Sequence, residues 1–168
     1  MKKLLLTTLC FALCLSLVVA ASAATKTGYM TVSAEVAVTC VMSVGHLNFG
    51  QYDGSYLQMT SQVDVQCTNG IGYEITYGPG ENFSDNKRYM RITEDPGTSV
   101  LEYRLDCQVS PTEPDIAGEC GDGATFGEKA MGTGNGSVQS FMVEGSIPPG
   151  QFLPFGDYMD NVLVTLTY

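Results

Sequence analysis

Residues 30–40 read Met-Thr-Val-Ser-Ala-Glu-Val-Ala-Val-Thr-Cys, and this stretch decides the fold. Every second position carries an apolar or sulfur-containing side chain: Met30, Val32, Ala34, Val36, Val38 and Cys40. The residues between them are mostly polar. Because successive side chains of a strand point to opposite faces, this alternation predicts a half-buried β-strand.

The same two-residue period recurs along the chain. It is present in 63–67, 73–77, 101–105 and 162–168, and Gly- or Pro-rich turns such as Gly78-Pro79-Gly80 lie between these runs. No window shows a sustained helical period. Many short strands joined by tight turns predict an all-β domain, and the length favours one immunoglobulin-like β-sandwich. Residues 110–136 are rich in Gly and acidic residues with little alternation, so we expect a long surface loop there.

The composition of the chain narrows the range of functions that it can have. The chain has 168 residues, 44% hydrophobic and 15% charged, with 18 acidic and 8 basic residues and a formal net charge of -10. This charge argues against binding nucleic acid or anionic lipid. His46 is the single histidine, and no set of acid, base and nucleophile is visible, so an enzyme is the least favoured class. The acidic residues of 110–136 lack the spacing of a calcium loop, and we expect no metal and no cofactor.

Residues 1–23 have the pattern of a secretory signal peptide. Lys2 and Lys3 precede an apolar run over 4–20, and Ala21-Ser22-Ala23 supplies small residues for cleavage. A lipid anchor at Cys14 is a weaker alternative because Leu13 is a poor residue before a lipidated cysteine, and a retained transmembrane helix is weaker still. We therefore expect an exported mature chain from about Ala24 without membrane insertion.

The number of cysteines predicts disulfides and therefore an oxidising compartment. Cys10 and Cys14 lie in the predicted signal, which leaves four cysteines in the mature chain: Cys40, Cys67, Cys107 and Cys120. An even number in an exported chain predicts disulfides, and four cysteines allow three connectivities. We favour Cys40–Cys67 and Cys107–Cys120 because both close short loops, each contributing about 3 kcal/mol in the chain-entropy model.

Both ends of the mature chain are rich in β-strand pattern. An alternating segment precedes Cys40, and the sequence stops within the alternating run 162–168. A sandwich that ends one strand early exposes a hydrophobic groove and an unpaired sheet edge. The N-terminal segment of another copy can cover that edge by β-strand addition, and such a head-to-tail contact produces a filament. The alternative is that both segments are ordinary strands of a complete sandwich.

Several pieces of the sequence resemble one known family. They are Val-Thr-Cys-Val-Met-Ser (38–43), Leu-Asn-Phe-Gly-Gln-Tyr-Asp (47–53), Val-Asp-Val-Gln-Cys (63–67), Ile-Pro-Pro-Gly-Gln (147–151) and the ending Gly-Asp-Tyr-Met-Asp-Asn-Val-Leu-Val-Thr-Leu-Thr-Tyr (156–168). In this order they resemble the spore coat protein U domain family, which includes pilins of archaic chaperone–usher pili. The resemblance implies a disulfide between Cys40 and Cys67, but it does not reach Cys107 and Cys120.

The resemblance also implies an incomplete immunoglobulin-like β-sandwich that is completed by a donor strand. Residues 24–36 would be the donor segment and residues 37–168 the pilin-like domain. The implied groove fillers are Tyr29 or Met30, with Val32, Ala34 and Val36. The implied groove edge carries Val162, Val164, Leu166 and Tyr168. A periplasmic chaperone would bind this strand and its terminal carboxylate. The residue at which the donor strand ends and the domain's own first strand begins stays open, since the alternation continues to Cys40.

We expect a non-enzymatic structural subunit that passes through the periplasm and is assembled by an outer-membrane usher. Neighbouring pilin subunits, in a homopolymer, would form a pilus on the bacterial surface that serves adhesion or biofilm formation. Two rivals stay open: a tip adhesin of the same system, and a self-complete secreted coat or matrix protein.

Overall fold

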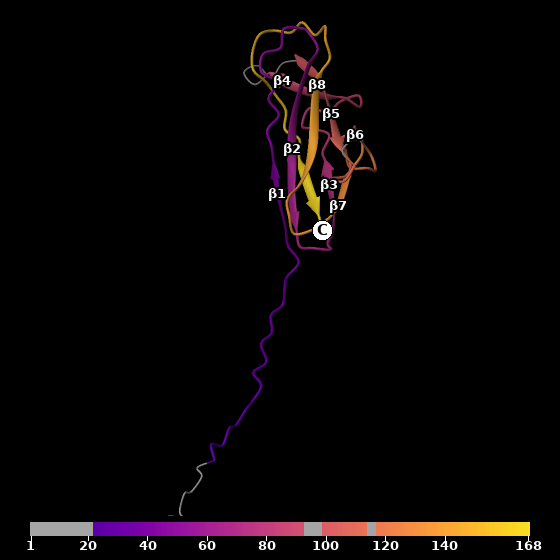
Figure 1. The fold of residues 1–168 in the computed structure, drawn as a ribbon. Helices are drawn as coiled ribbons and strands as arrows, with labels where there is room; N and C mark the ends of the chain where they lie inside the picture. Colours follow the sequence, from indigo (N-terminus) through magenta and orange to yellow (C-terminus); the bar gives the residue numbers. More distant parts are fainter. Residues whose placement is uncertain (1–21, 93–98, 114–116) are drawn as a thin grey trace, which may run out of the picture. The chain divides into compact units, whose positions relative to one another are not determined.

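The structure is a computed structural model, and it describes residues 22–92, 99–113 and 117–168. Most of the predicted signal peptide, residues 1–21, lies outside the described residues. The chain divides into two units, 1–35 and 36–168, and we refer to the second as the body. The regular structure of the described residues consists of β-strands (Figure 1).

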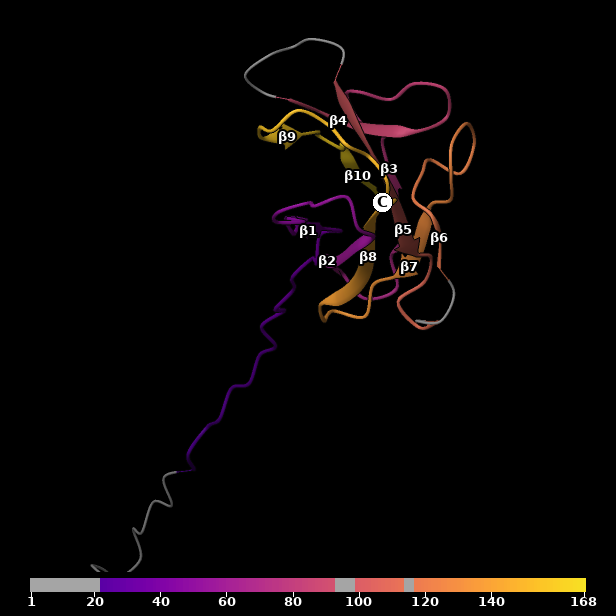
Figure 2. The same cartoon turned by 90° about the horizontal axis from the view of Figure 1, so that it is seen from above.

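Two antiparallel sheets make up the body (Figures 1 and 2). The larger sheet has the strand order β1 (Cys40–Val44), β2 (Leu57–Cys67), β8 (Gln139–Ile147), β5 (Val100–Gln108), β4 (Arg88–Ile92) and β9 (Tyr158–Met159), with β6 (Ala117–Glu119) paired to β5. The smaller sheet has the order β10 (Val164–Thr167), β3 (Gly72–Tyr77) and β7 (Ala130–Thr133). The all-β prediction is confirmed.

The core lies between the inner faces of the two sheets. Three predicted alternating runs become β2, β3 and β5, and their inward side chains are buried: Val63, Val65, Cys67, Tyr73, Ile75, Tyr77, Leu101, Tyr103 and Leu105. Phe141 of β8 is fully buried and meets Tyr73 of β3 edge to face, with ring centroids 6.1 Å apart. Burial of one such large apolar side chain stabilises the fold by about 1.5–3 kcal/mol.

Both predicted disulfides are present. Cys40 and Cys67 are directly opposite in the β1–β2 pairing, so their bridge ties the first strand to its neighbour. The second bridge joins Cys107 of β5 to Cys120, which follows β6 directly, and both of these side chains are buried. The pairing inferred from short loop lengths is therefore confirmed.

Two expectations about local structure need correction. The stretch 110–136 is not only a surface loop, because it contains β6 and β7. Ala130 of β7 is buried, and a Cβ on Gly132 would overlap the ring of Tyr73, so β7 is held by close backbone approach rather than by large alternating side chains. The predicted strand over 30–40 is also wrong within a single copy, because β1 begins only at Cys40.

Candidate functional site

The core is only partly closed at β1 and β10, which are edge strands of the two sheets. Among the described residues β1 pairs only with β2, and β10 pairs only with β3. Inward-facing Met42 of β1 and Val164 and Leu166 of β10 pack on the core but stay half-buried, as does Val162 just before β10. The residues paired with Met42 and Leu166, Val65 and Ile75, are each 0% exposed. The sandwich is thus open along this side.

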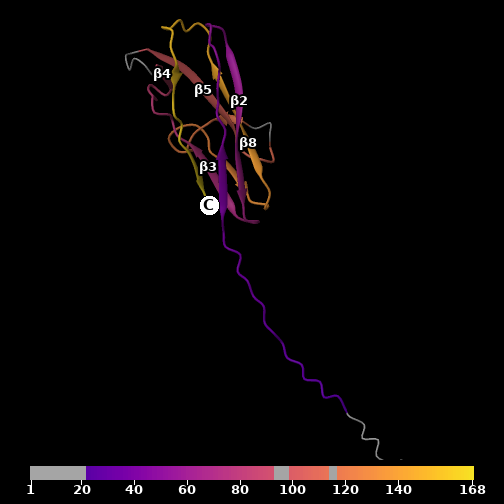
Figure 3. The same ribbon diagram turned by 90° about the vertical axis from the view of Figure 1, so that its left-hand side faces the viewer.

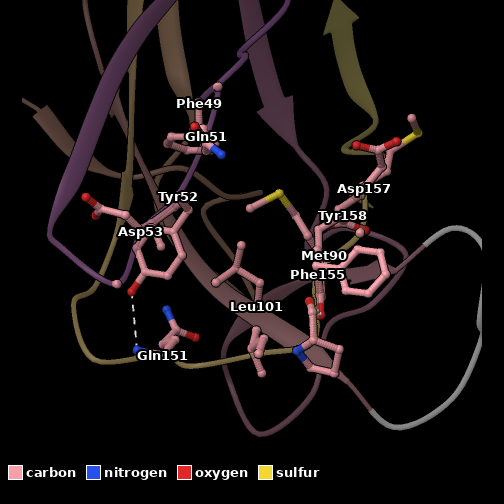
Figure 4. A pocket seen from close by; sticks show the side chains of 18 of the residues that line it. Phe49, Gln51, Tyr52, Asp53, Met90, Leu101, Gln151, Phe155, Asp157 and Tyr158 are labelled. Atoms are coloured by element: carbon pink, nitrogen blue, oxygen red, sulfur yellow. Dashed lines mark hydrogen bonds between the residues drawn. The ribbon is translucent and has the colours of Figure 1, made fainter.

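A cleft of about 1070 Å³ lies at one end of this open side. Its walls are residues 47–54, which follow β1, and residues 151–160, which precede β10 (Figure 4). Met90, Leu101 and Ile147 also line it, and the last two are buried core residues. We call the open side, from this cleft along β1 and β10, the groove. The half-buried Met42, Val164 and Leu166 along the groove suit an extended apolar segment. The cleft at its end also carries polar side chains, among them Gln51, Gln151 and Asp160.

Gly145 of β8 shapes the wall that follows β1. A Cβ on Gly145 would lie 2.7 Å from the ring of Phe49 and would also clash with Leu47. The glycine therefore lets residues 47–49 fold back onto the inner face of the larger sheet, where both side chains are half-buried.

Hydrogen bonds of Tyr52 and Gln151 join the two walls of the cleft to each other and to β5. Tyr52 donates its hydroxyl to the carbonyl of Pro148 at 2.7 Å and accepts the Gln151 backbone N–H at 3.3 Å (Figure 4). The Gln151 side chain donates to the Glu102 carbonyl at 3.0 Å and accepts the Glu102 N–H at 2.8 Å. Gln151 thus satisfies both backbone groups of a β5 residue, which anchors the second wall to the larger sheet.

Asp160 anchors the chain just before β10. Its carboxylate accepts the Tyr103 hydroxyl at 2.5 Å and the Asn82 side-chain amide at 3.0 Å. Burial, followed by the hydrogen bond to Asp160, raises the pKa of Tyr103, so this hydroxyl stays protonated and donates. The start of the groove-edge strand is therefore attached to β5 and to the loop after β3.

Arg88 is a buried charge, and no pattern in the sequence points to it. It is 2% exposed and donates to the carbonyls of Gly78 at 2.8 Å and Cys120 at 2.9 Å. Its guanidinium also lies 4.5 Å from the ring centre of Phe126, and burial lowers its pKa. These contacts join the end of β3 to the second disulfide, so Arg88 has a structural role.

The predicted donor segment makes no strand in the described part of its unit. Residues 22–35 are exposed, with Met30 at 88% and Val32 at 86%. In the body, residues 37–39 are fastened by Thr68, whose hydroxyl donates to the Ala37 carbonyl at 3.3 Å and accepts the Thr39 N–H at 3.1 Å. The pairing of the domain's own first strand therefore begins after Val36.

The structure also places the predicted groove-edge residues and the single histidine. Val162, Val164 and Leu166 share the core-facing side of the groove edge, whereas Tyr168 is 59% exposed. His46 is exposed. The described residues contain no cluster of three or more His, Cys, Asp or Glu side chains arranged to hold a metal ion. They also include no helix with the length and apolar character needed to cross a membrane.

Comparison with known proteins now identifies the family. The profile of the Spore Coat Protein U domain matches residues 26–165. The chain is also 31% identical over 164 residues to Protein U of Myxococcus xanthus, with 88% of each chain covered. This chain belongs to the Spore Coat Protein U domain family.

The fold of this family member is similar to a chain of the CsuC–CsuE chaperone–tip adhesion subunit pre-assembly complex from the archaic chaperone–usher Csu pili of Acinetobacter baumannii. The two superpose with a TM-score of 0.58 and 18% sequence identity, over 79% of this chain and 40% of that chain. This Spore Coat Protein U domain chain therefore spans less than half the length of the chain that it matches. The likeness confirms the predicted incomplete immunoglobulin-like sandwich of pilin type.

Proposed function

We propose that this protein is a structural subunit of a chaperone–usher surface pilus and that its copies polymerise by donor-strand exchange. The observation that carries the proposal is the groove, where the inward side chains of β1 and β10 are half-buried and each strand has one unpaired edge among the described residues. A β-strand laid between these edges would bury the exposed core and satisfy backbone groups.

The N-terminal segment has the chemistry of that missing strand. Met30, Val32, Ala34 and Val36 form one apolar face that could fill the groove. At about 3.4 Å per residue, residues 30–36 would span roughly 20 Å, so this segment is long enough to lie along the five residues of β1 or the four residues of β10. Lys26 and Glu35 balance each other, so this segment adds no net charge to an acidic partner.

A free subunit with an open groove needs protection before assembly. We propose that a periplasmic chaperone covers the groove, with Val162, Val164, Leu166 and Tyr168 at the edge that it binds, and that an outer-membrane usher exchanges it for the next subunit. The family and the fold of the solved Csu complex support these partners. The finished fibre on the bacterial surface would serve adhesion or biofilm formation.

Deletion of residues 25–36 tests the proposal. The shortened chain keeps β1 to β10 and should still form a complex with the chaperone, but it should no longer form fibres. Electron microscopy of the fibres and co-purification with the chaperone measure the two outcomes. Fibres formed by the deleted chain would contradict the assignment of the donor segment. A stable, cooperatively folding monomer of the full-length mature chain would instead favour a self-complete matrix protein.

A further inference from the structure

The chain enters β1 through three residues that are not held by burial. Ala37, Val38 and Thr39 are exposed, Val38 at 56%, and β1 begins directly after them at Cys40. β2 ends at the same end of the body, because Cys40 pairs with Cys67 (Figures 1 and 3). Contacts that fix these three residues therefore also fix where the predicted donor segment leaves the body.

Thr68 continues the pairing of the first strand where the backbone of β2 turns away. The Thr68 carbonyl accepts the Ile71 N–H at 3.2 Å within the turn 68–71, while the Thr68 N–H still donates to the Thr39 carbonyl at 2.9 Å. The Thr39 N–H donates to the Thr68 hydroxyl at 3.1 Å, and the same hydroxyl lies 3.3 Å from the Ala37 carbonyl oxygen. This side chain thus replaces the backbone partner that a longer β2 would supply. We call these contacts the Thr68 clamp.

The turn that carries Thr68 is itself held by a second loop. Gly70 donates its N–H to the Gly134 carbonyl at 2.8 Å, and Gly134 donates its N–H to the Ile71 carbonyl at 2.7 Å. Gly134 packs so closely that a Cβ on it would lie 2.5 Å from the Thr68 carbonyl oxygen. Cys67, directly before Thr68, is in the first disulfide. The clamp hydroxyl is therefore presented from a firmly held backbone.

A copy could fill its own groove only by reversing direction just before β1. Its donor segment would then lie antiparallel to β1, with residues 37–39 as the loop of a hairpin. Short hairpin loops favour Gly, Asn or Asp because they contain residues with positive φ. Residues 37–39 are Ala, Val and Thr, and the described non-glycine residues with positive φ are Asp85 and Asn86. The Thr68 clamp holds the same three residues in the register that continues β1 past Cys67, which opposes a reversal.

We infer that Thr68 is a positioning residue for strand exchange. Its clamp on residues 37–39 keeps the donor segment out of the groove of its own copy and leaves it available to the next copy. This inference rests on the proposed function, because it assigns the residue that directs the donor segment. Loss of the clamp removes neither the segment nor the groove, so it should shift the balance from fibres toward monomers that are filled by their own segment.

The test uses a mature chain in which self-filling can be measured. Val38→Asn with Thr39→Gly places a favoured hairpin dipeptide before β1 and keeps the backbone groups that Thr68 binds. In this chain Thr68→Val should raise the ratio of self-filled monomers to fibres about five-fold, the effect of one net hydrogen bond. Thr68→Ser retains a hydroxyl and should keep the ratio close to that with Thr68. Size-exclusion chromatography and electron microscopy measure the two products.

Hydrogen exchange separates self-filling from a damaged fold. In a self-filled monomer the amides of residues 25–36 should be protected, because they are paired in the groove. A chain that is merely destabilised would leave these amides unprotected and would lower the yield of monomers and fibres alike. Thr60→Val is the matched control, because Thr60 is an exposed threonine on the same strand, β2, and it should leave the ratio unchanged.

An equal ratio for Thr68 and Thr68→Val would overturn the inference, and so would the absence of self-filled monomers from both chains. If Thr68→Val yields neither product, a second variant decides. A short Gly/Ser linker inserted between Val36 and Ala37 leaves the clamp in place but lets the segment reverse before it, so self-filled monomers should form. Fibres alone from that variant would overturn the inference. Failure of the unmodified chain to form any fibre would instead refute the proposed function.

Discussion

At the scale of single residues, the absence of a side chain at Gly145 creates one wall of the groove. Leu47 and Phe49 occupy the space that a Cβ would take, so the inner face of β8 is completed by residues from a different segment. An inward-facing glycine in a strand usually weakens it, but here it permits close approach of another part of the chain. The position is therefore sensitive to any larger residue.

Gly145→Ala should lower the free energy of unfolding by about 1–3 kcal/mol, because the added methyl forces Leu47 and Phe49 out of place. Urea unfolding measures the change. Gly72→Ala is the control, since a Cβ at Gly72 would meet no atom within 4 Å and the backbone there is not left-handed. Equal stability of the two variants would contradict the packing role of Gly145.

Buried tyrosines make the stability sensitive to alkaline pH. Burial raises the pKa of Tyr77 and Tyr103 above the ordinary value of 10.0. Above about pH 10 the unfolded chain loses these protons while the folded chain keeps them. The folded state then binds more protons, so its stability is full below pH 10 and falls as the pH rises further, by up to about 1.4 kcal/mol per pH unit for each tyrosine.

Tyr103→Phe should remove one tyrosine's contribution to that slope. The variant also loses the hydrogen bond to Asp160, which lowers stability at neutral pH by about 1–2 kcal/mol. Urea unfolding between pH 8 and pH 11 checks both effects. Tyr56→Phe, at a side chain that is 57% exposed, is the control for loss of a tyrosine hydroxyl and should cost little stability at pH 8.

At the scale of elements, β1 depends on its covalent link to β2. As an edge strand it has hydrogen-bonding partners on one side only among the described residues, and its inward side chains are half-buried. The Cys40–Cys67 bridge holds it at the correct register while the groove is empty. The Cys107–Cys120 bridge lies instead in the closed part of the core.

Replacing each disulfide by two alanines should separate these roles. Either replacement should lower the free energy of unfolding by about 3 kcal/mol, from the loop lengths of 27 and 13 residues. Only loss of Cys40–Cys67 should increase hydrogen exchange in β1. Faster exchange in β1 after loss of Cys107–Cys120 alone would show that the two bridges are not independent.

The donor segment should enter the groove with only one of its two faces, the apolar face that carries Val32. Val32→Asp places a charge on the face that is expected to enter the groove and should prevent polymerisation, since burying an unpaired carboxylate is very costly. Ser33→Asp adds the same charge on the opposite face and should leave polymerisation intact. Fibre yield by electron microscopy compares the two, and equal yields would contradict the predicted alternation of the inserted strand.

At the scale of the whole molecule, the body exposes its groove whenever no second chain fills it. An isolated mature chain should therefore aggregate or exchange strands during expression without a chaperone. Adding a second copy of residues 25–36 after Tyr168 through a flexible Gly/Ser linker should convert it into a stable monomer. Size-exclusion chromatography and thermal unfolding measure this.

The matched control for that fusion carries Val32→Asp in the added segment only. It should remain aggregation-prone and melt at a lower temperature than the fusion with the natural segment. If both fusions were equally monomeric and stable, the added strand would not be filling the groove.

The sequence by itself determined the all-β class, because the two-residue alternation in runs such as 63–67 and 73–77 records which side chains must be buried. It also indicated both disulfides through short loop lengths. It did not reveal the central position of β8, since its inward position 145 is a glycine whose space is filled by Leu47 and Phe49.

Only the tertiary structure decided where the core stays open. Burial of Arg88, formation of β7 within 110–136 and the half-exposure of Val164 and Leu166 all depend on which distant segments become neighbours. Alternation shows that a strand has an apolar face, but the same pattern occurs whether that face is covered by its own chain or by another. The physical reason is that local periodicity specifies side-chain direction, whereas strand neighbours are chosen by contacts between residues far apart in the sequence.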